Sequence, residues 1–314
     1  MSARKLPQAL IMLGLLAVFA IFLIYPIWLT VKGAFESSAP AGSTTRGFTL
    51  YHIAAIFRDP ALRAGMLNSL GIASCTTLLC LLIALPLAVL SARFDFPGKG
   101  MLSALILVPM ILPPFVGAIG LTHLLGRSGA LNALLIKVGL IHTGIDFIGQ
   151  GGFWAIVFVQ SLALYPILYL NATAALANLD PALDEAAENL GAGWWRRFGN
   201  ITLPLIRPGL FAGAIIVFIW SFTELGTPLM FDYQVVTPVQ IFNGIKEMAT
   251  SKMPYALTAV MLLSAILLYL TGKLVFGAWV RPFTELSKWV TVTLTFVSGW
   301  LYLWRNRALY LEDL

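Results

Sequence analysis

The chain has 314 residues, of which 59% are hydrophobic and only 11% are charged, and its mean hydropathy is +0.87. A soluble globular domain needs a more polar surface than this composition supplies, so the sequence indicates an integral membrane protein. The formal net charge is +6, but the Lys and Arg residues are scattered at the ends of apolar runs, which argues against a nucleic-acid partner.

Apolar runs long enough to cross a bilayer recur along the chain and predict an all-α, polytopic fold with about six transmembrane helices. The predicted spans are residues 9–31, 66–92, 101–125, 153–176, 210–231 and 255–278. Arg4 and Lys5 precede the first span, which favours a cytoplasmic N-terminus. Pro86 should kink the second span unless neighbouring helices compensate for it.

Three segments between the spans are predicted to be external. Residues 32–63 are polar and carry a short amphipathic helix near residues 50–57. In the second segment, residues 131–141 are apolar but too short to span, so a helix lying on the membrane or dipping into it is expected. Residues 232–254 form the third external loop.

The third span contains three prolines, Pro109, Pro113 and Pro114. Its middle must therefore bend or unwind, and broken backbone at membrane depth is tolerated only where protein or a water-filled cavity surrounds it. Two interpretations stay open. The prolines either place this span beside a translocation pathway or form a packing kink.

A charged segment, residues 180–210, lies between the fourth and fifth spans. Asp180 followed by Pro181 is typical of a helix start, because the carboxylate accepts free amide hydrogens of the first turn. Acidic residues such as Asp184 follow where the helix dipole favours them. Gly191 is suited to a left-handed C-terminal position, so we predict a helix over residues 181–190.

A second short helical piece should follow and present large apolar groups beside two arginines. These residues are Trp194, Trp195 and Phe198, with Arg196 and Arg197. Pro204 and Pro208 are expected to break the chain before the next apolar run. The segment therefore predicts a helical hairpin at a membrane surface.

The same segment resembles the EAA loop, E-A-A-x3-G-x9-I-x-L-P, of the permease subunits of binding-protein-dependent ABC importers. The matching residues are Glu185, Ala186, Ala187, Gly191, Ile201, Leu203 and Pro204. The resemblance extends more loosely over residues 65–280. It implies the type I ABC importer permease fold, and it makes residues 180–210 the cytoplasmic coupling loop that sits in a cleft of an ATP-hydrolysing subunit.

The resemblance assigns roles within this loop: Glu185 orients the coupling helix, Gly191 allows its turn, and the aromatic residues contact the ATPase. The implied coupling residues are Glu185, Ala186, Ala187, Gly191, Ala192, Trp194, Trp195, Arg196, Phe198, Leu203 and Pro204. The implied partners are an ABC ATPase dimer, a second permease subunit of the same or a sister chain, an external solute-binding protein and the lipid bilayer. The implied location is the bacterial cytoplasmic (inner) membrane.

One acidic residue, Glu224, lies inside a predicted span, about 22 Å along a helix from Gly209. A carboxylate at membrane depth is costly and commonly functional, so Glu224 is either a gate or pathway residue or a structural group bonded to a neighbouring span. The further pathway candidates are Thr223, Thr227, Asn171, Pro113 and Pro114.

Residues for other chemistry are missing. The chain has no G-x-x-x-x-G-K-[ST] loop, so it should bind no cofactor itself, with ATP and Mg²⁺ held by the partner subunit. Cys75 and Cys80 lie five residues apart in one apolar run and indicate neither a disulfide nor a metal site. The three histidines lack metal-ligand spacing. No partnered nucleophile is visible, so the chain is not expected to be an enzyme.

We expect three parts: a span plus external loop over residues 1–64, a permease core over residues 65–281, and a tail over residues 282–314. Residues 289–304 of the tail predict an interfacial aromatic helix, with a seventh span or a disordered tail as the alternatives. Two rival functions remain. One is an ion-coupled secondary transporter, although no convincing inverted repeat is present. The other is a polytopic membrane enzyme, which would need the catalytic cluster that is missing here.

The substrate is indicated only through the resemblance. Sugar permeases commonly carry an aspartate just before the Gly-Ala of the loop, whereas this chain has Asn189 and Leu190 there. This resembles the iron(III), polyamine, phosphonate and sulfate or molybdate branch. The stretch ELGTPLMF, residues 224–231, resembles the iron(III), polyamine and phosphonate members.

Overall fold

The computed structural model describes residues 5–37, 47–111, 113–148, 152–245 and 251–277, and over these residues the fold is helical with one isolated β-bridge, Glu36 to Phe48. The chain divides into two units, Met1–Ile266 and Leu267–Leu314. Of the second unit, only the end of one helix is described. The predicted tail helix, residues 289–304, lies outside the described residues, and the three-part division stays a prediction.

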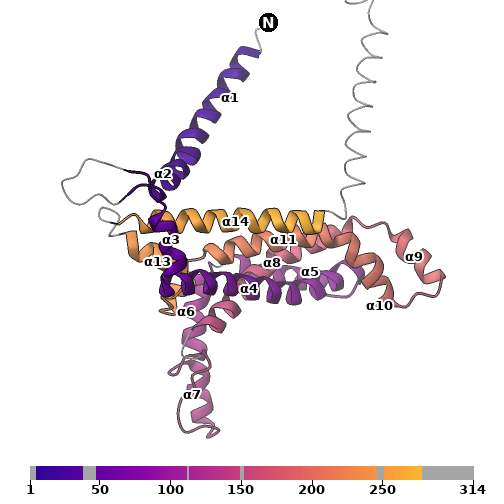
Figure 1. Cartoon of the computed structure of the whole chain (residues 1–314). Helices are drawn as coiled ribbons and strands as arrows, with labels where there is room; N and C mark the ends of the chain where they lie inside the picture. Colours follow the sequence, from indigo (N-terminus) through magenta and orange to yellow (C-terminus); the bar gives the residue numbers. More distant parts are fainter. Residues whose placement is uncertain (1–4, 38–46, 112, 149–151, 246–250, 278–314) are drawn as a thin grey trace, which may run out of the picture. The chain divides into compact units, whose positions relative to one another are not determined.

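The helices follow one another through the described chain (Figure 1). In order they are α1 (Lys5–Phe19), η1 (Ala20–Ile24), α2 (Tyr25–Ala34), α3 (Tyr51–Arg58), α4 (Pro60–Arg93), α5 (Lys99–Leu107), η2 (Val108–Ile111), α6 (Pro114–Leu125), α7 (Ala130–Lys137), α8 (Phe153–Ala177), α9 (Pro181–Asn189), α10 (Trp194–Arg197), η3 (Phe198–Thr202), α11 (Leu203–Thr223), α12 (Gly226–Met230), α13 (Thr237–Gly244) and α14 (Met253–Gly277).

Five helical stretches of the described chain are long and apolar enough to cross a membrane. They are Met12–Ala34, Pro60–Arg93, Phe153–Ala177, Trp194–Thr223 and Met253–Leu274. A sixth candidate is the pair Lys99–Ile111 and Pro114–Lys137, which is bent by 98°. The prediction of an all-α membrane protein with about six spans is therefore confirmed, as is the predicted bend at the prolines of the third span.

The core is formed by α4, α8 and α11, which pack side by side (Figure 1). α4 and α8 run in the same direction, because Ser161 contacts Thr76 while Tyr169, further along α8, donates to Ser91. α11 runs the opposite way. The buried side chains shared by these helices include Cys80, Ala84, Ala88, Leu164, Leu168, Ala172, Ile206, Leu210 and Val217.

Two glycines of α11 allow it to approach α8 closely. A Cβ on Gly209 would lie 2.6 Å from the Cβ of Ala175, and one on Gly213 would lie 3.0 Å from the Cβ of Asn171. The sequence therefore contains a G-x-x-x-G pair at a helix crossing, the arrangement by which membrane helices gain packing contacts in the absence of a hydrophobic driving force. The sequence analysis missed it.

A second buried cluster joins α3 to the early part of α4, the end of α11 and the start of α14. Ile56 of α3 and Phe222 of α11 are almost completely buried in it. His52 of α3 is also buried, and desolvation, together with the charge of Lys252, lowers the pKa of its imidazole below the ordinary value of 6.5. The short helix predicted near residues 50–57 is thus confirmed as α3.

Several predicted boundaries were wrong. α4 begins at Pro60, six residues before the predicted start, because the Asp59 side chain accepts from the amides of the first turn. The helix continues through Pro86. The expected break at Pro204 and Pro208 is absent: α10, η3 and α11 form one continuous stretch, in which the wider π turn η3 leads into Pro204 near the start of α11.

The fifth span and the third external loop also differ from prediction. The span predicted over residues 210–231 ends at Thr223, where the backbone of Glu224 becomes extended. The loop predicted over residues 232–254 contains an additional helix, α13, whose Thr237 amide donates to Ser69 of α4. A short helix was correctly predicted in residues 131–141, where α7 lies.

Candidate functional site

The helix α9 has the ends that its sequence predicts. The Asp180 side chain accepts from the Ala182 amide at 3.0 Å, and Pro181 occupies the first turn. At the other end Gly191 adopts φ +82°, its amide donates to Glu188 at 2.8 Å, and the amide of Ala192 donates further back, to Ala187, at 3.0 Å. Only glycine adopts this left-handed conformation without strain, so Gly191 sets the sharp turn toward α10.

The hairpin formed by α9 and α10 presents an exposed surface. Neither helix contains a buried residue. Glu185 and Ala186 are exposed, and the Trp195 side chain is 79% exposed. Apolar area of this kind on a polar loop is typical of a protein-binding surface.

The aromatic side chains of the hairpin are ordered against one another. Trp194 stacks on Phe198 with ring centroids 5.3 Å apart, and it meets Trp195 edge to face at 4.4 Å. Arg196 is exposed beside them. The remaining predicted coupling residues lie closer to the core: Ala187, Ala192, Leu203 and Pro204 are half-buried.

A group of charged side chains attaches the hairpin to the end of α4. Arg93, the last residue of α4, donates to Asp184 of α9 at 2.7 Å and to the hydroxyl of Thr202 at 3.1 Å. Arg197 of α10 lies 3.9 Å from the second carboxylate oxygen of Asp184 and also pairs with Glu188. The sequence did not predict a role for Arg93 at this site.

Glu224 lies at the break between α11 and α12, and both of its carboxylate oxygens accept hydrogen bonds. Oε1 accepts from the amide of Gly226 at 3.0 Å, and Oε2 accepts from the amide of Thr227 at 2.9 Å. A carboxylate at the start of a helix is stabilised by the free amide groups there and by the helix dipole.

Glu224 is also bonded to a neighbouring span, as the structural alternative anticipated. Gln160 of α8, which is completely buried, donates to Glu224 Oε2 at 3.3 Å and accepts a hydrogen bond from Ser221 of α11. Sequence reasoning missed Gln160 and Ser221. A glutamine within the otherwise apolar stretch IVFVQSLAL was the available signal, since polar groups inside spans are expensive and usually partnered.

The other pathway candidates divide into two groups. Thr227 is buried next to Glu224, and Phe115, which follows Pro114, lies against Gly226, so the proline break of the third span meets the break after α11. Pro113 and Pro114 line a small pocket of about 120 Å³ against α8.

The side chains of the two remaining candidates take no part in this group. Asn171 is eleven residues beyond Gln160 on α8, roughly 16 Å along the helix, and its side chain donates to the backbone of Ile167 at 2.9 Å. Thr223 is exposed and donates to the carbonyl of Ile219, also at 2.9 Å. The structure therefore does not bring all six pathway candidates together.

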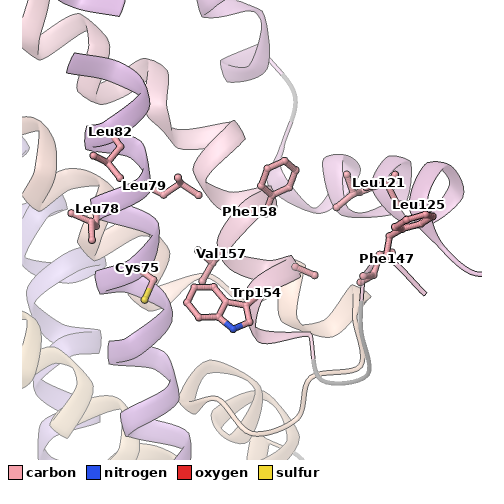
Figure 2. A pocket seen from close by; sticks show the side chains of 12 residues that line it. Cys75, Leu78, Leu79, Leu82, Leu121, Leu125, Phe147, Trp154, Val157 and Phe158 are labelled. Atoms are coloured by element: carbon pink, nitrogen blue, oxygen red, sulfur yellow. The ribbon is translucent and has the colours of Figure 1, made fainter. Parts of the chain in front are cut away.

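A larger pocket of about 580 Å³ lies between α4, α6, α8 and the segment before α8 (Figure 2). Figure 2 shows side chains from these elements around one space, among them Cys75, Leu121, Phe147 and Trp154. Its lining is mainly apolar and includes no acidic, basic or histidine side chain. Among the described residues no cluster of three or more His, Cys, Asp or Glu residues could hold a metal ion.

The family model for the binding-protein-dependent transport system inner membrane component matches residues 84–285, from the last third of α4 to beyond α14. The chain belongs to this family. It is therefore a permease subunit of an ABC transporter, and this family assignment does not favour the rival function of an ion-coupled secondary transporter. The matched range contains the α9–α10 hairpin and Glu224.

Two curated relatives show how the similarity is distributed. The chain is 33% identical over 176 residues to the molybdenum transport system permease protein ModB of Escherichia coli K12, covering 56% of this chain and 74% of ModB. It is 28% identical over 278 residues to the ferric transport system permease protein FbpB of Actinobacillus pleuropneumoniae, covering 85% of this chain but 38% of FbpB.

A solved structure agrees with the fold. A chain of the bacterial alginate ABC transporter, in complex with an alginate pentasaccharide-bound periplasmic protein, matches with a TM-score of 0.65 and 19% sequence identity. The match covers 90% of this chain and 96% of that chain. It confirms the permease fold expected from the sequence.

Proposed function

We propose that this chain lines the translocation pathway of an ATP-driven importer and is coupled to ATPase subunits through residues 180–210. The observation that carries the proposal is the α9–α10 hairpin. It lies between two spans, buries none of its own residues, and exposes Trp195 beside the E-A-A residues. A segment this exposed and this ordered is suited to docking on another subunit.

The proposed assembly contains a second permease, identical or homologous, an ABC ATPase dimer under the hairpins, and a solute-binding protein on the opposite face. The chain itself binds no cofactor, and ATP with Mg²⁺ is held by the ATPase. The protein lies in the bacterial inner membrane. The N-terminus and the hairpin are both cytoplasmic, an orientation supported by Arg4 and Lys5 and by Arg93 at the end of α4.

The mechanism that this arrangement supports is mechanical. α8 leads directly into the hairpin, and the hairpin continues without interruption into α11. When ATP binding closes the ATPase dimer, the hairpins move with it. Since α8 and α11 are packed together along their lengths, they turn as one body and expose the pathway to the other side of the membrane.

On the pathway side, we assign Glu224 to a structural position at the edge of the route. Both of its oxygens are already occupied by amide donors, so it has little capacity left for a solute. The break that it stabilises lies against the start of α6, and helix breaks at membrane depth are tolerated where they face protein or a water-filled cavity. The backbone around Pro113, Pro114 and Glu224 is therefore the proposed gate region.

We propose a small inorganic ion as the solute. The names of the two relatives carry this proposal, since one is a molybdenum and the other a ferric permease. The Asn189 and Leu190 pair before Gly191 supports the same branch over sugars. Polyamines and phosphonates, which the sequence also indicated, are the alternatives that the experiment must distinguish.

The decisive test is co-purification from the native host in mild detergent, using tagged wild type, Trp195→Ala and the matched control Trp154→Ala. Both tryptophans are largely exposed, 79% and 70%, but Trp154 lies at the opposite end of the α8 and α11 pair. We expect an ATPase to purify with wild type and with Trp154→Ala, and to be lost with Trp195→Ala. Elemental analysis and mass spectrometry of the co-purified solute-binding protein then identify the solute. A chain that purifies without any ATPase would refute the proposal.

A further inference from the structure

Polar contacts contribute to the attachment of the α9–α10 hairpin to the spans. No residue of α9 or α10 is buried. A helix that buries nothing is free to pivot about its ends unless specific side chains hold it. The side chains that do so are those of Arg93, Asp184 and Arg197.

Asp184 is the centre of this group, because its two carboxylate oxygens face arginines from different elements. Oδ2 accepts from Arg93 at 2.7 Å, and Oδ1 lies 3.9 Å from Arg197 Nε. The Asp184 and Arg197 side chains are only 22% and 12% exposed. This degree of enclosure distinguishes the group from surface ion pairs, which contribute little.

Arg93 connects Asp184 to the core. It is the last residue of α4, whose inner half is buried against α8 and α11. Its second guanidinium nitrogen donates to the hydroxyl of Thr202, a buried residue at the end of the π turn η3, which directly precedes α11. The planar guanidinium therefore holds α4, α9 and the start of α11 in fixed relative positions, which a flexible lysine ammonium would do less well.

We propose that Asp184, held between Arg93 and Arg197, is the positioning residue that transmits movement of the hairpin to α4. The proposal rests on the coupling function proposed above and deepens it. α8 and α11 are joined to the hairpin through the main chain. α4 is not joined directly to the hairpin through the main chain, and the Arg93 to Asp184 bond links the two instead. Without that bond the hairpin moves with the ATPase while α4 stays behind, so ATP hydrolysis is separated from opening of the spans.

The chain offers a matched control for this proposal. Lys99 donates to Asp95 at 2.8 Å in the turn after α4, a bond of nearly the same length on the same side of the bundle. The Asp95 side chain is 98% exposed, and this pair joins the turn only to the start of α5. Asp95→Asn therefore removes an exposed ion pair of similar length without touching the hairpin.

The experiment uses the intact complex with its ATPase in lipid vesicles, with a single reporter cysteine, Leu67→Cys, after replacement of both native cysteines. Leu67 is 60% exposed and lies near the start of α4, at the opposite end of that helix from Arg93, so it reports the movement of α4 itself. The measurements are the ATPase content of the complex, its ATP hydrolysis rate, and the ATP-dependent change in reporter reactivity toward a membrane-impermeant maleimide. The reporter complex must itself hydrolyse ATP and respond to ATP, and a failure there is a failure of the proposed function, not of this inference.

In Asp184→Asn we expect a normal ATPase content and continued ATP hydrolysis, with an ATP-dependent reactivity change reduced about 5-fold or more, as for loss of a typical coupling free energy. Arg93→Gln should behave alike, Arg93→Lys should retain part of the response, and Asp95→Asn should match the reporter complex. The double variant Arg93→Gln with Asp184→Asn should lose no more than the larger single loss, because the two residues act as one pair.

Two outcomes would overturn the inference. If Asp184→Asn responds to ATP as fully as Asp95→Asn, the bond does not transmit movement. If Asp184→Asn loses the ATPase, Asp184 maintains the docking surface instead of transmitting its motion.

Discussion

The left-handed conformation of Gly191 leads to a prediction about the hairpin that separates backbone strain from side-chain size. Gly191 has φ +82°, whereas Gly193, two residues later, has φ −66°. A Cβ at either position would meet nothing within 4 Å. Gly191→Ala and Gly193→Ala therefore add the same group to the same open surface, and only the first strains the backbone.

The expected magnitude follows from that difference. A residue with a Cβ in the left-handed region costs about 1–2 kcal/mol. A cost of that size changes a local equilibrium by about 5–30-fold. Nothing in α9 compensates through burial, so the strain should act directly on the closed hairpin. Gly191→Val should be more severe than Gly191→Ala, and Gly191→Asn milder, because asparagine tolerates this region.

The assay is limited tryptic cleavage at Arg196 and Arg197, followed by intact-mass analysis of the purified chain in detergent. When opening and closing are fast relative to cleavage, the cleavage rate tracks the open population. We expect Gly191→Ala to raise it about 5–30-fold over wild type and Gly193→Ala to leave it unchanged. Equal cleavage of the two alanine variants would refute the reasoning, since strain would then play no part.

Three further predictions concern the rest of the fold. Gly209→Ala should destabilise the crossing of α8 and α11 by about 1–3 kcal/mol relative to Gly120→Ala. Both changes raise helix propensity equally, but a Cβ at Gly120 meets no other atom within 4 Å. Equal denaturation midpoints of the two variants would contradict the packing argument. Asn132→Leu removes three hydrogen bonds between α7 and residues 126 and 145, which should destabilise this segment by about 1–3 kcal/mol and speed its amide exchange. Asn178→Leu, at an exposed helix end, should leave amide exchange in this segment unchanged. Burial lowers the folded-state pKa of His52, so its stabilising contribution is complete above the unfolded value of 6.5 and is lost as the pH falls below it. Between about pH 7 and about pH 5, the thermal denaturation temperature of the wild type should therefore fall more than that of His52→Gln.

The sequence predicted the number of apolar spans well because length and hydropathy alone determine which segments cross a bilayer. It also predicted α9, since Asp180, Pro181 and Gly191 act through local backbone geometry. Helix ends that depend on contacts with neighbouring elements were harder to predict from the sequence. The stop at Thr223 was missed because Glu224 ends the helix with its own side chain and a bond from Gln160, 64 residues earlier.

The treatment of proline shows the same limit. The break at Pro113 and Pro114 was predicted correctly, whereas the break at Pro204 and Pro208 was not. Proline removes one amide donor, and the consequence depends on what surrounds the freed carbonyl. Before Pro204 the chain widens into the π turn η3, and Thr202 of that turn is buried and bonded to Arg93. Local sequence does not reveal such support.

Two groups of bonded polar side chains lie at opposite ends of α11. One contains Arg93 and Thr202, and the other contains Glu224 and Gln160. α11 has 21 residues, roughly 31 Å of helix, which is about the thickness of the hydrocarbon core. It starts at the Arg93 and Thr202 bond and ends at Glu224. Close packing of Gly209 and Gly213 against α8 resists bending between these points. Under the proposed mechanism, a displacement of the hairpin would therefore be carried along α11 to the break at Glu224, which lies against the start of α6.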